Sequence, residues 1–188
     1  MPNSITVHEA ADLLPRCARI LVIGRSGGGK SALFVQLSQT YQLGYISMDR
    51  YVFWLPGWTI RDPEERRALV AKFVAGERWV FDGNNTHSLD LRLARADLIV
   101  WVRVPRWLTL WGVVKRMIRN CGTVRDHMPE GCPEQLPDRE FLDYIWNFDR
   151  RTAPRLLQKI AQHGAHVPIV ELRSRRDAAA LLSGNRAD

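Results

Sequence analysis

One stretch, ILVIGRSGGGKSALF over residues 20–34, constrains the fold of this chain more than any other. Four glycines fall within positions 24–29, directly after an apolar run. Glycine loses more conformational freedom on ordering than other residues, so this concentration needs a reason. The segment matches the pattern G-x-x-x-x-G-K-[ST], whose backbone N–H groups wrap phosphates at the start of a helix. A glycine-rich turn that binds nothing is the simpler alternative. It is disfavoured because a predicted strand precedes the glycines and a predicted helix follows them.

The phosphate-binding pattern gives each of its residues an expected role. Lys30 is expected to reach the β- and γ-phosphates, and the Ser31 hydroxyl is expected to ligate Mg²⁺. The pattern therefore predicts a nucleotide site, with ATP and Mg²⁺ as the implied ligands, at Gly24, Arg25, Ser26, Gly27, Gly28, Gly29, Lys30 and Ser31.

Two acidic residues end apolar runs elsewhere in the chain. Asp82 ends WVFD and is the better candidate for a carboxylate beside Mg²⁺. Asp49 follows YISM, and it could serve the metal or could orient and deprotonate an acceptor hydroxyl. Either residue could instead cap a turn or a helix. We favour function for both, because ligands bind at the carboxyl ends of the strands in open α/β sheets.

Short apolar runs alternate with helical patterns along the chain. Strands without polar alternation, separated by helices, indicate an α/β fold with a parallel sheet that is covered on both faces. We expect an N-terminal helical extension over 1–18, a kinase-like domain over 19–188, and a Gly- and Pro-rich lid at about 121–137. The expected strands are 19–23, 44–48, 79–81, 98–104 and 167–172, and the expected helices are 30–40, 62–76, 88–95, 106–120, 138–162 (with a break at Pro154) and 176–182.

Composition indicates the cellular location of the chain and the kind of partner that it binds. No run approaches the roughly 18 apolar residues of a membrane span, and we expect no membrane partner. The N-terminus lacks the pattern of a secretion signal, and three cysteines in 188 residues suit reduced thiols. A cytoplasmic location is therefore expected. The net charge of +7 implies an anionic partner, which could be a nucleotide, a nucleic acid or an acidic lipid.

The expected helix at 106–120 has two different faces. An apolar stripe recurs at helical spacing and predicts a core contact, formed by Trp107, Trp111, Val114 and Ile118. Arg116 and Arg119 lie on another face, with no acidic residue anywhere in 103–125. We expect these two arginines to stabilise a transferring phosphoryl group as the lid closes. A solvated basic surface is the alternative.

The acceptor side is less defined. DRYVFWLPGW over 49–58 places aromatic residues around a Pro-Gly turn, and these could stack an acceptor ring or could seal the edge of the sheet. The acceptor-side candidates are Arg50, Trp54, Trp58, Asn84 and Arg92. A zinc site at Cys121, His127 and Cys132 has too few ligands, and free thiols are favoured.

Several segments together resemble one family. The phosphate loop, MDRYVFWLPGW (48–58), RWVFDGN (78–84), LDLRLARADLIVWVRVPRWLTLW (89–111), GCPE (131–134) and FLDYIWNF (141–148) are similar to the DNA-topology-modulation (FlaR-type) proteins. These are adenylate-kinase-like P-loop kinases that are often labelled AAA-family ATPases. The resemblance covers the chain from about Arg19 to its C-terminus.

The resemblance implies a P-loop NTPase fold with a five-stranded parallel sheet in the order 2-3-1-4-5. It also implies ATP binding, a nucleotide site at 27–32 that includes Ala32, and an acceptor pocket opposite the nucleotide. The lid arginine of adenylate kinases falls on Arg116. Two positions depart from adenylate kinases: Gly112 stands where they have an arginine against adenine, and Arg103 stands where they have an aspartate.

Absences exclude other P-loop classes. The chain has no N-K-x-D motif of guanine sites and no L-S-G-G-Q motif of transporter ATPases. The sequence predicts an ATP-dependent kinase that moves the γ-phosphoryl group to a small-molecule or nucleotide acceptor. A nucleotide-controlled switch or ATPase with a protein partner is one alternative. Direct nucleic-acid binding through the basic segment 103–125 is another, less favoured because no helix-turn-helix or zinc-finger pattern is present.

Overall fold

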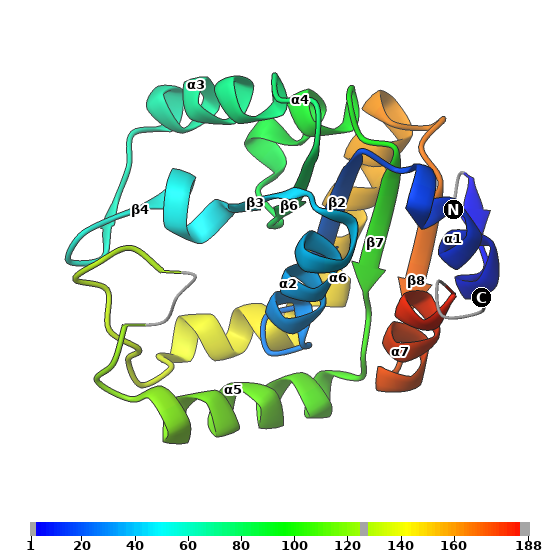
Figure 1. The fold of residues 1–188 in the computed structure, drawn as a ribbon. Coiled ribbons are helices and arrows are strands. Elements are labelled where there is room, and N and C mark those ends of the chain that lie inside the picture. The colour runs from blue at the N-terminus through cyan, green and yellow to red at the C-terminus, as the bar shows by residue number, and fades with distance from the viewer. Residues whose placement is uncertain (1–2, 125–127, 185–188) are drawn as a thin grey trace.

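A parallel six-stranded sheet forms the centre of the molecule in this computed structural model, which describes residues 3–124 and 128–184 (Figure 1). The strand order is β1-β8-β7-β2-β6-β3, and every pairing in this sheet is parallel. The order of the last five confirms the predicted arrangement 2-3-1-4-5. The strands are β1 (Ser4–Ile5), β2 (Arg19–Gly24), β3 (Gly44–Ser47), β6 (Trp79–Asp82), β7 (Leu98–Val102) and β8 (Ile169–Leu172).

The sixth strand, β1, lies in the segment for which the sequence predicted only a helix. Ser4 and Ile5 pair with Ile169 and Val170 at the edge of the sheet. A two-residue strand leaves no periodic pattern in a sequence, because pairing with its neighbour alone defines it. The predicted helix follows as α1 (Val7–Leu13) with its capping box, and a short 3-10 turn (Leu14–Arg16) leads into β2.

Helices cover both faces of the sheet and bury two hydrophobic layers. One layer joins α1, α2 (Lys30–Tyr41) and α7 (Arg175–Ser183) to one set of strand side chains. The other layer joins α3 (Pro63–Val74), α4 (Leu89–Leu93) and α6 (Arg139–His163) to the alternate set. Since strand side chains alternate between faces, a strand that is covered on both sides must be apolar throughout, as β2 is.

Helix α6 contains Pro154 and remains one helix from Arg139 to His163, which corrects the predicted break. Pro154 is exposed, so water can reach the carbonyl group that its missing N–H leaves without a partner. Within the described part of the chain, no helix is both long enough and apolar enough to cross a membrane.

The connections at the carboxyl edge of the sheet are longer and carry short elements. After β3 come one π-helical turn, η2 (Asp49–Phe53), and an antiparallel hairpin of β4 (Trp54–Leu55) and β5 (Thr59–Ile60). After β6 comes a 3-10 turn, η3 (Thr86–Ser88). After β7 comes α5 (Arg106–Asn120), which runs alongside the rest of the molecule toward the lid (Figure 1).

The predicted core stripe of α5 is wrong. Trp107, Trp111 and Ile118 are 65%, 59% and 70% exposed, whereas the buried side chains of α5 are Thr109 and Val113. The stripe has the correct helical spacing, but α5 packs through its opposite side. Periodicity identifies an apolar face and does not identify what covers it.

Candidate active site

Backbone contacts define the shape of the phosphate loop. β2 ends at Gly24, the loop turns through Gly27 and Gly29 with φ of 80° and 90°, and α2 begins at Lys30. A Cβ on Gly27 would lie 2.2 Å from the carbonyl oxygen of Thr109 in α5, so the loop is packed against that helix. A Cβ on Gly29 would meet nothing within 4 Å. The loop is therefore packed against α5 at Gly27 and open at Gly29.

The open side carries the expected cation. Lys30 Nζ donates a hydrogen bond of 3.2 Å to the carbonyl oxygen of Arg25, so its ammonium group lies across the loop. No side chain caps the first turn of α2. Backbone N–H groups at the start of a helix, beside an ammonium group, make a site suited to phosphate oxygens.

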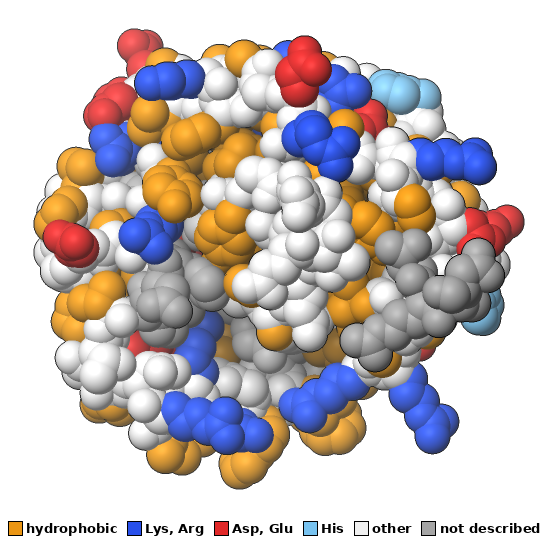
Figure 2. Space-filling view, in the orientation of Figure 1, with side chains coloured by type: hydrophobic (Ala, Val, Ile, Leu, Met, Phe, Trp, Pro, Cys, Tyr) orange, Lys and Arg blue, Asp and Glu red, His pale blue; other side chains and the backbone are white. Residues whose placement is uncertain are grey.

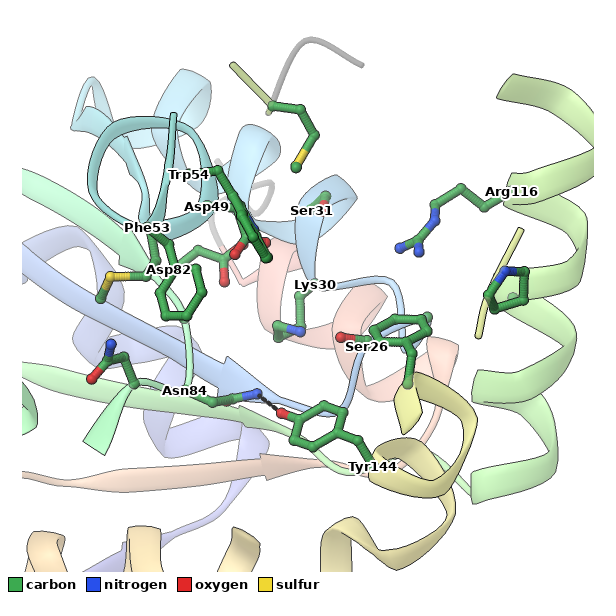
Figure 3. Close-up of a pocket in the computed structure, with 18 of the residues that line it drawn as sticks. Ser26, Lys30, Ser31, Asp49, Phe53, Trp54, Asp82, Asn84, Arg116 and Tyr144 are labelled. Carbon is green, nitrogen blue, oxygen red and sulfur yellow. Dashed lines mark hydrogen bonds between the residues drawn. The ribbon is translucent and has the colours of Figure 1, made fainter. Parts of the chain in front are cut away.

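Two carboxylates share the space beside Lys30. Asp49 and Asp82 come from the ends of β3 and β6 and lie close to the ammonium group (Figure 3). The pKa of Asp82 is raised to about 6, chiefly by burial. The Asp49 charge adds to this rise, and the Lys30 and Arg92 charges oppose it. A cation that bound between the carboxylates would reverse the effect of burial, so this pair is a candidate ligand set for Mg²⁺.

These groups line one large cavity of about 930 Å³ at the carboxyl edge of the sheet. Its walls come from the phosphate loop, the turns after β3 and β6, α5, the lid and α6. Phosphate-loop residues in the wall are Ser26, Gly27, Gly29, Lys30, Ser31 and Ala32, whereas Gly24, Arg25 and Gly28 do not line the cavity.

Aromatic side chains form the wall opposite the phosphate loop. Trp54 makes edge contacts with Phe53 and with Trp58, at centroid distances of 5.0 and 5.2 Å. All three line the cavity beyond Asp49. The segment is a hairpin whose aromatic side chains line the cavity, and stacking of an acceptor ring against them stays a prediction.

The lid binds this hairpin directly. Gly57 N–H donates to the carbonyl oxygen of Gly131 (3.1 Å), and Trp58 Nε1 donates to that of Pro133 (3.2 Å). The buried Cys132 thiol donates to the carbonyl oxygen of Leu55 (3.3 Å), and its sulfur accepts from Trp58 N–H (3.4 Å). Trp58 has φ of 62°, a conformation that is rare for a bulky residue. We call these contacts the lid–hairpin clasp.

Arg116 and Arg119 separate in space. Arg116 lines the cavity from α5, and its Nε donates to Glu134 Oε1 at 2.8 Å (Figure 3). Arg119 is exposed and does not line the cavity, which corrects its predicted catalytic position. Arg119 lies about 60° around the helix from Arg116, on the side of the exposed Lys115, and this rotation takes its side chain out of the cavity.

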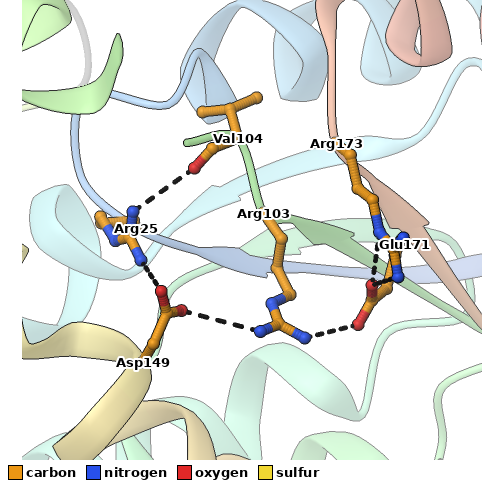
Figure 4. A network of polar contacts seen from close by, with 6 residues as sticks. All are labelled: Arg25, Arg103, Val104, Asp149, Glu171 and Arg173. Carbon is orange, nitrogen blue, oxygen red and sulfur yellow. Dashed lines mark hydrogen bonds and ion pairs between the residues drawn. The ribbon is translucent and has the colours of Figure 1, made fainter. Parts of the chain in front are cut away.

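Arg25 holds the phosphate loop from behind. Its side chain is 4% exposed, donates to the carbonyl oxygen of Val104 (3.4 Å) and forms an ion pair with Asp149 of α6. Asp149 also lies 3.8 Å from Arg103, which donates to Glu171 at 2.8 Å, and Glu171 accepts two hydrogen bonds from Arg173 (Figure 4). This network uses the Arg25 side chain for support, so any part that Arg25 has in the predicted nucleotide site falls to its backbone.

Two of the predicted acceptor-side residues support the site through hydrogen bonds, and of these Asn84 also lines the cavity. Asn84 accepts from Gly24 N–H (2.8 Å), and its amide nitrogen donates to the carbonyl oxygen of Gly24 (2.7 Å) and to Tyr144 Oη (3.0 Å). Arg92 is fully buried and does not line the cavity; it donates to the carbonyl oxygens of Gly83 (2.7 Å) and Asn85. Arg92 is therefore a positioning residue for the turn after β6. Burial lowers its pKa to about 9.

The remaining predicted residues divide between pocket and surface. Trp54 and Trp58 line the cavity, whereas Arg50 is exposed, lies 5.5 Å from the Tyr51 ring centroid and does not line it. Cys121, Cys132 and Cys17 are free thiols, and His127 lies outside the described residues. Pocket residues without a role predicted from the sequence include Thr86, Glu134, Asp138, Phe141 and Tyr144. Three of them lie in the family-like segments GCPE and FLDYIWNF, but their positions in the cavity come from tertiary packing.

Comparison with known proteins shows the fold and no closer relationship. No family model and no curated protein sequence matches the chain. Among solved structures, shikimate kinase from Acinetobacter baumannii in complex with shikimate aligns with a TM-score of 0.55 at 11% identity, over 92% of this chain and 93% of that one. Shikimate kinase from Bacteroides thetaiotaomicron aligns with a TM-score of 0.44 at 15% identity, over 89% and 95%. Deoxyadenosine kinase from M. mycoides with bound dCTP gives 0.42 at 11% identity, over 88% and 95%. The chain thus has the fold of P-loop kinases.

Proposed function

We propose that this protein is an ATP-dependent phosphotransferase with a small-molecule or nucleotide acceptor. One observation carries the proposal: Lys30, Asp49 and Asp82 meet in a single cavity at the mouth of a phosphate loop. Phosphate binding alone would need only the loop and the lysine. A second carboxylate beside them supplies the group that an acceptor hydroxyl needs.

The residues present fit a magnesium–nucleotide complex. The Ser31 hydroxyl and the carboxylates of Asp49 and Asp82 line the same cavity, and Gly29 leaves its front open. The described residues contain no cluster of three or more acidic, His or Cys side chains that could hold a metal alone. Magnesium suits such a site, since it is held by one or two carboxylates together with substrate phosphates and water. When bound there, it would offset charge on the phosphate oxygens.

The chain's own residues then have distinct tasks. Lys30 stabilises negative charge at the end of the triphosphate, and Arg116 offers a second cation from α5. Asp49 accepts the proton of the acceptor hydroxyl as its oxygen attacks the γ-phosphorus. The bond from the γ-phosphorus to the bridging oxygen breaks at the same centre, and ADP leaves with that electron pair. The protein forms no covalent bond to the substrates in this step. Most of the rate enhancement therefore comes from positioning the two substrates and from stabilising charge in the transition state.

The aromatic wall supports an acceptor with a flat ring. Trp54 and Trp58 present rings to the cavity on the side of Asp49, which places a stacking surface beside the proposed base. Nucleosides and nucleotides satisfy this condition, as do other ring-bearing hydroxyl compounds. The resemblance to DNA-topology-modulation proteins remains a prediction and does not select among these acceptors.

A phosphate-transfer screen tests the proposal. The purified chain is incubated with γ-labelled Mg-ATP and with nucleosides, nucleoside monophosphates, sugars and hydroxylated metabolites, and labelled product is separated. We expect transfer to at least one ring-bearing acceptor. Release of labelled phosphate from ATP without any labelled product would instead indicate the ATPase or switch alternative.

Lys30→Ala tests the phosphate side directly. The fold loses one hydrogen bond from the ammonium group to the Arg25 carbonyl oxygen, so it should persist while transfer falls about 100-fold or more. Lys72→Ala, at an exposed position of α3, is the matched control. Normal transfer by a folded Lys30→Ala protein would refute the mechanism.

A further inference from the structure

Exposed hydrophobic side chains concentrate in one part of the molecule. Across the described ranges 3–124 and 128–184, nine large hydrophobic residues are exposed, and seven of them lie between positions 107 and 146. The most exposed on any helix are Trp107, Trp111 and Ile118, all on α5. Isolated exposed hydrophobics are ordinary on soluble proteins, whereas a cluster marks a contact surface.

The three side chains form one straight stripe. At 3.6 residues per turn they fall within about 40° of one another around the axis of α5, and the helix is about 22 Å long. We call this stripe, with the neighbouring Lys115, the outer face of α5. The outer face points away from the site, because Gly112 and Arg116 lie on the opposite side of the helix and line the cavity.

Charge on α5 has a single sign. The helix contains four basic residues and no acidic residue. Lys115 is exposed beside the apolar stripe, and Arg119 is exposed further around the helix. Arg106 stacks over Trp146 of α6 at 4.1 Å, which extends the patch across the helix pair. Figure 2 shows hydrophobic and basic side chains side by side along the edge of the molecule where Figure 1 places α5.

We propose that the outer face of α5 docks on an anionic phospholipid surface. Indole rings and an aliphatic side chain on one straight helical face, bordered by Lys and Arg, are the features of helices that lie in the plane of a membrane interface. Indoles prefer the headgroup level, and long basic side chains reach anionic headgroups from beside the apolar stripe. The expectation of no membrane partner rested on the lack of an apolar run long enough to span a membrane, which a helix that lies at the membrane surface does not need.

Other occupants fit the surface less well. A second copy of the chain, docked through the same face, would bring together two helices that each carry four basic residues and no acidic residue. Nucleic acid would use the cations, but Ile118 at the centre of the stripe adds nothing to phosphate contacts. A lipid interface uses the apolar and the basic side chains together.

Vesicle flotation with the full chain tests this proposal. We expect the protein to bind vesicles of phosphatidylcholine with one quarter phosphatidylglycerol at least tenfold more tightly than vesicles of phosphatidylcholine alone. Tryptophan emission should shift to the blue on binding, and raising NaCl from 0.1 to 0.5 M should weaken binding several-fold, because the cations are screened.

The variant Trp107→Ser/Trp111→Ser should lose at least tenfold in vesicle affinity with an unchanged melting temperature, since both side chains are largely exposed. Ile60→Ser, at a 56% exposed position on β5, is the matched control and should bind like the parent protein. Lys115→Glu should weaken binding to the anionic vesicles only.

Three results would overturn the proposal. The first is absence of vesicle binding by the folded protein. The second is retention of a labelled DNA duplex without vesicle binding, which would indicate the nucleic-acid alternative. The third is a dimer in sedimentation analysis that Trp107→Ser/Trp111→Ser dissociates. None of these outcomes depends on the proposed phosphotransfer, because no vesicle measurement uses ATP.

Discussion

The two ends of the cavity are built in different ways. At the phosphate end, the loop is held by backbone contacts with β7 and α5, by the Asn84 amide and by the Arg25 ion pair with Asp149. At the acceptor end, the hairpin and lid are joined by the four hydrogen bonds of the lid–hairpin clasp, two of which involve the Cys132 sulfur. The phosphate end is built on the sheet itself. The acceptor end is a contact between the hairpin and the lid, which both extend away from the sheet.

This difference teaches how a fold can hold one substrate end firmly and let the other open. A loop packed between core elements unfolds only with the core, whereas a few hydrogen bonds between loops open at low cost. We therefore expect a preformed phosphate site and an acceptor site that opens to admit its ligand, as lids do in many enzymes.

The largest expected effect concerns Arg116, which reaches the phosphate end from the lid side. Arg116→Ala should lower kcat about 10³-fold and should change Mg-ATP affinity much less, because a cation that acts on developing charge contributes mainly in the transition state. ADP formation and calorimetry measure the two quantities. Arg119→Ala, outside the cavity, is the comparison variant. Equal losses in kcat and affinity would make Arg116 a binding residue only.

A pair of glycines tests the rigidity of the phosphate end. Gly27→Ala should cost about 3 kcal/mol of unfolding free energy, because its Cβ would overlap the Thr109 carbonyl group. Gly29→Ala should cost about 1–2 kcal/mol, since only its positive φ opposes a side chain. Denaturant unfolding without nucleotide measures both. Equal costs would mean that α5 does not brace the loop.

Asp82 makes the stability of the nucleotide-free protein depend on pH. Its pKa of about 6 lies above the ordinary value of 3.8, so between these values the folded state binds more protons than the unfolded state. Stability should therefore fall as pH rises from about 4 to 6, by roughly 2 kcal/mol, and then level off. Asp82→Asn should remove this fall and should weaken Mg-ATP binding at pH 7. An unchanged pH profile in Asp82→Asn would contradict the assignment.

The smallest expected effect concerns the clasp. Trp58→Phe removes the hydrogen bond from Nε1 to Pro133, worth about 1 kcal/mol, and should expose the Cys132 thiol about fivefold more often. Thiol labelling in a Cys121→Ser background measures this opening, because Cys17 is buried and burial raises its pKa to about 12. Mg-ATP affinity should stay the same. Labelling at the parent rate would show that the clasp does not gate this end.

The sheet order was implied by the family resemblance, whereas the strands and the acids at their ends were predicted from the residues themselves, for a physical reason. Buried parallel strands must be apolar on both faces, and Asp49 and Asp82 stand where such strands stop. Sequence reasoning was less successful with arginines. Arg25, Arg92 and Arg119 occupy, respectively, an ion-pair network, a fully buried turn and the surface. A guanidinium group suits all three environments, so an arginine in the sequence does not indicate where its side chain lies in the structure.

The amino-acid sequence by itself determined the phosphate loop, the strands that carry it and the helical spacing of α5, because these depend on local backbone freedom and on the alternation of apolar residues. Only the tertiary structure decided which face of α5 meets the loop, which arginine reaches the cavity and how the lid meets the hairpin. Those choices arise from contacts between segments that are distant in the chain, such as Gly27 with Thr109 and Trp58 with Pro133, and no local pattern encodes them.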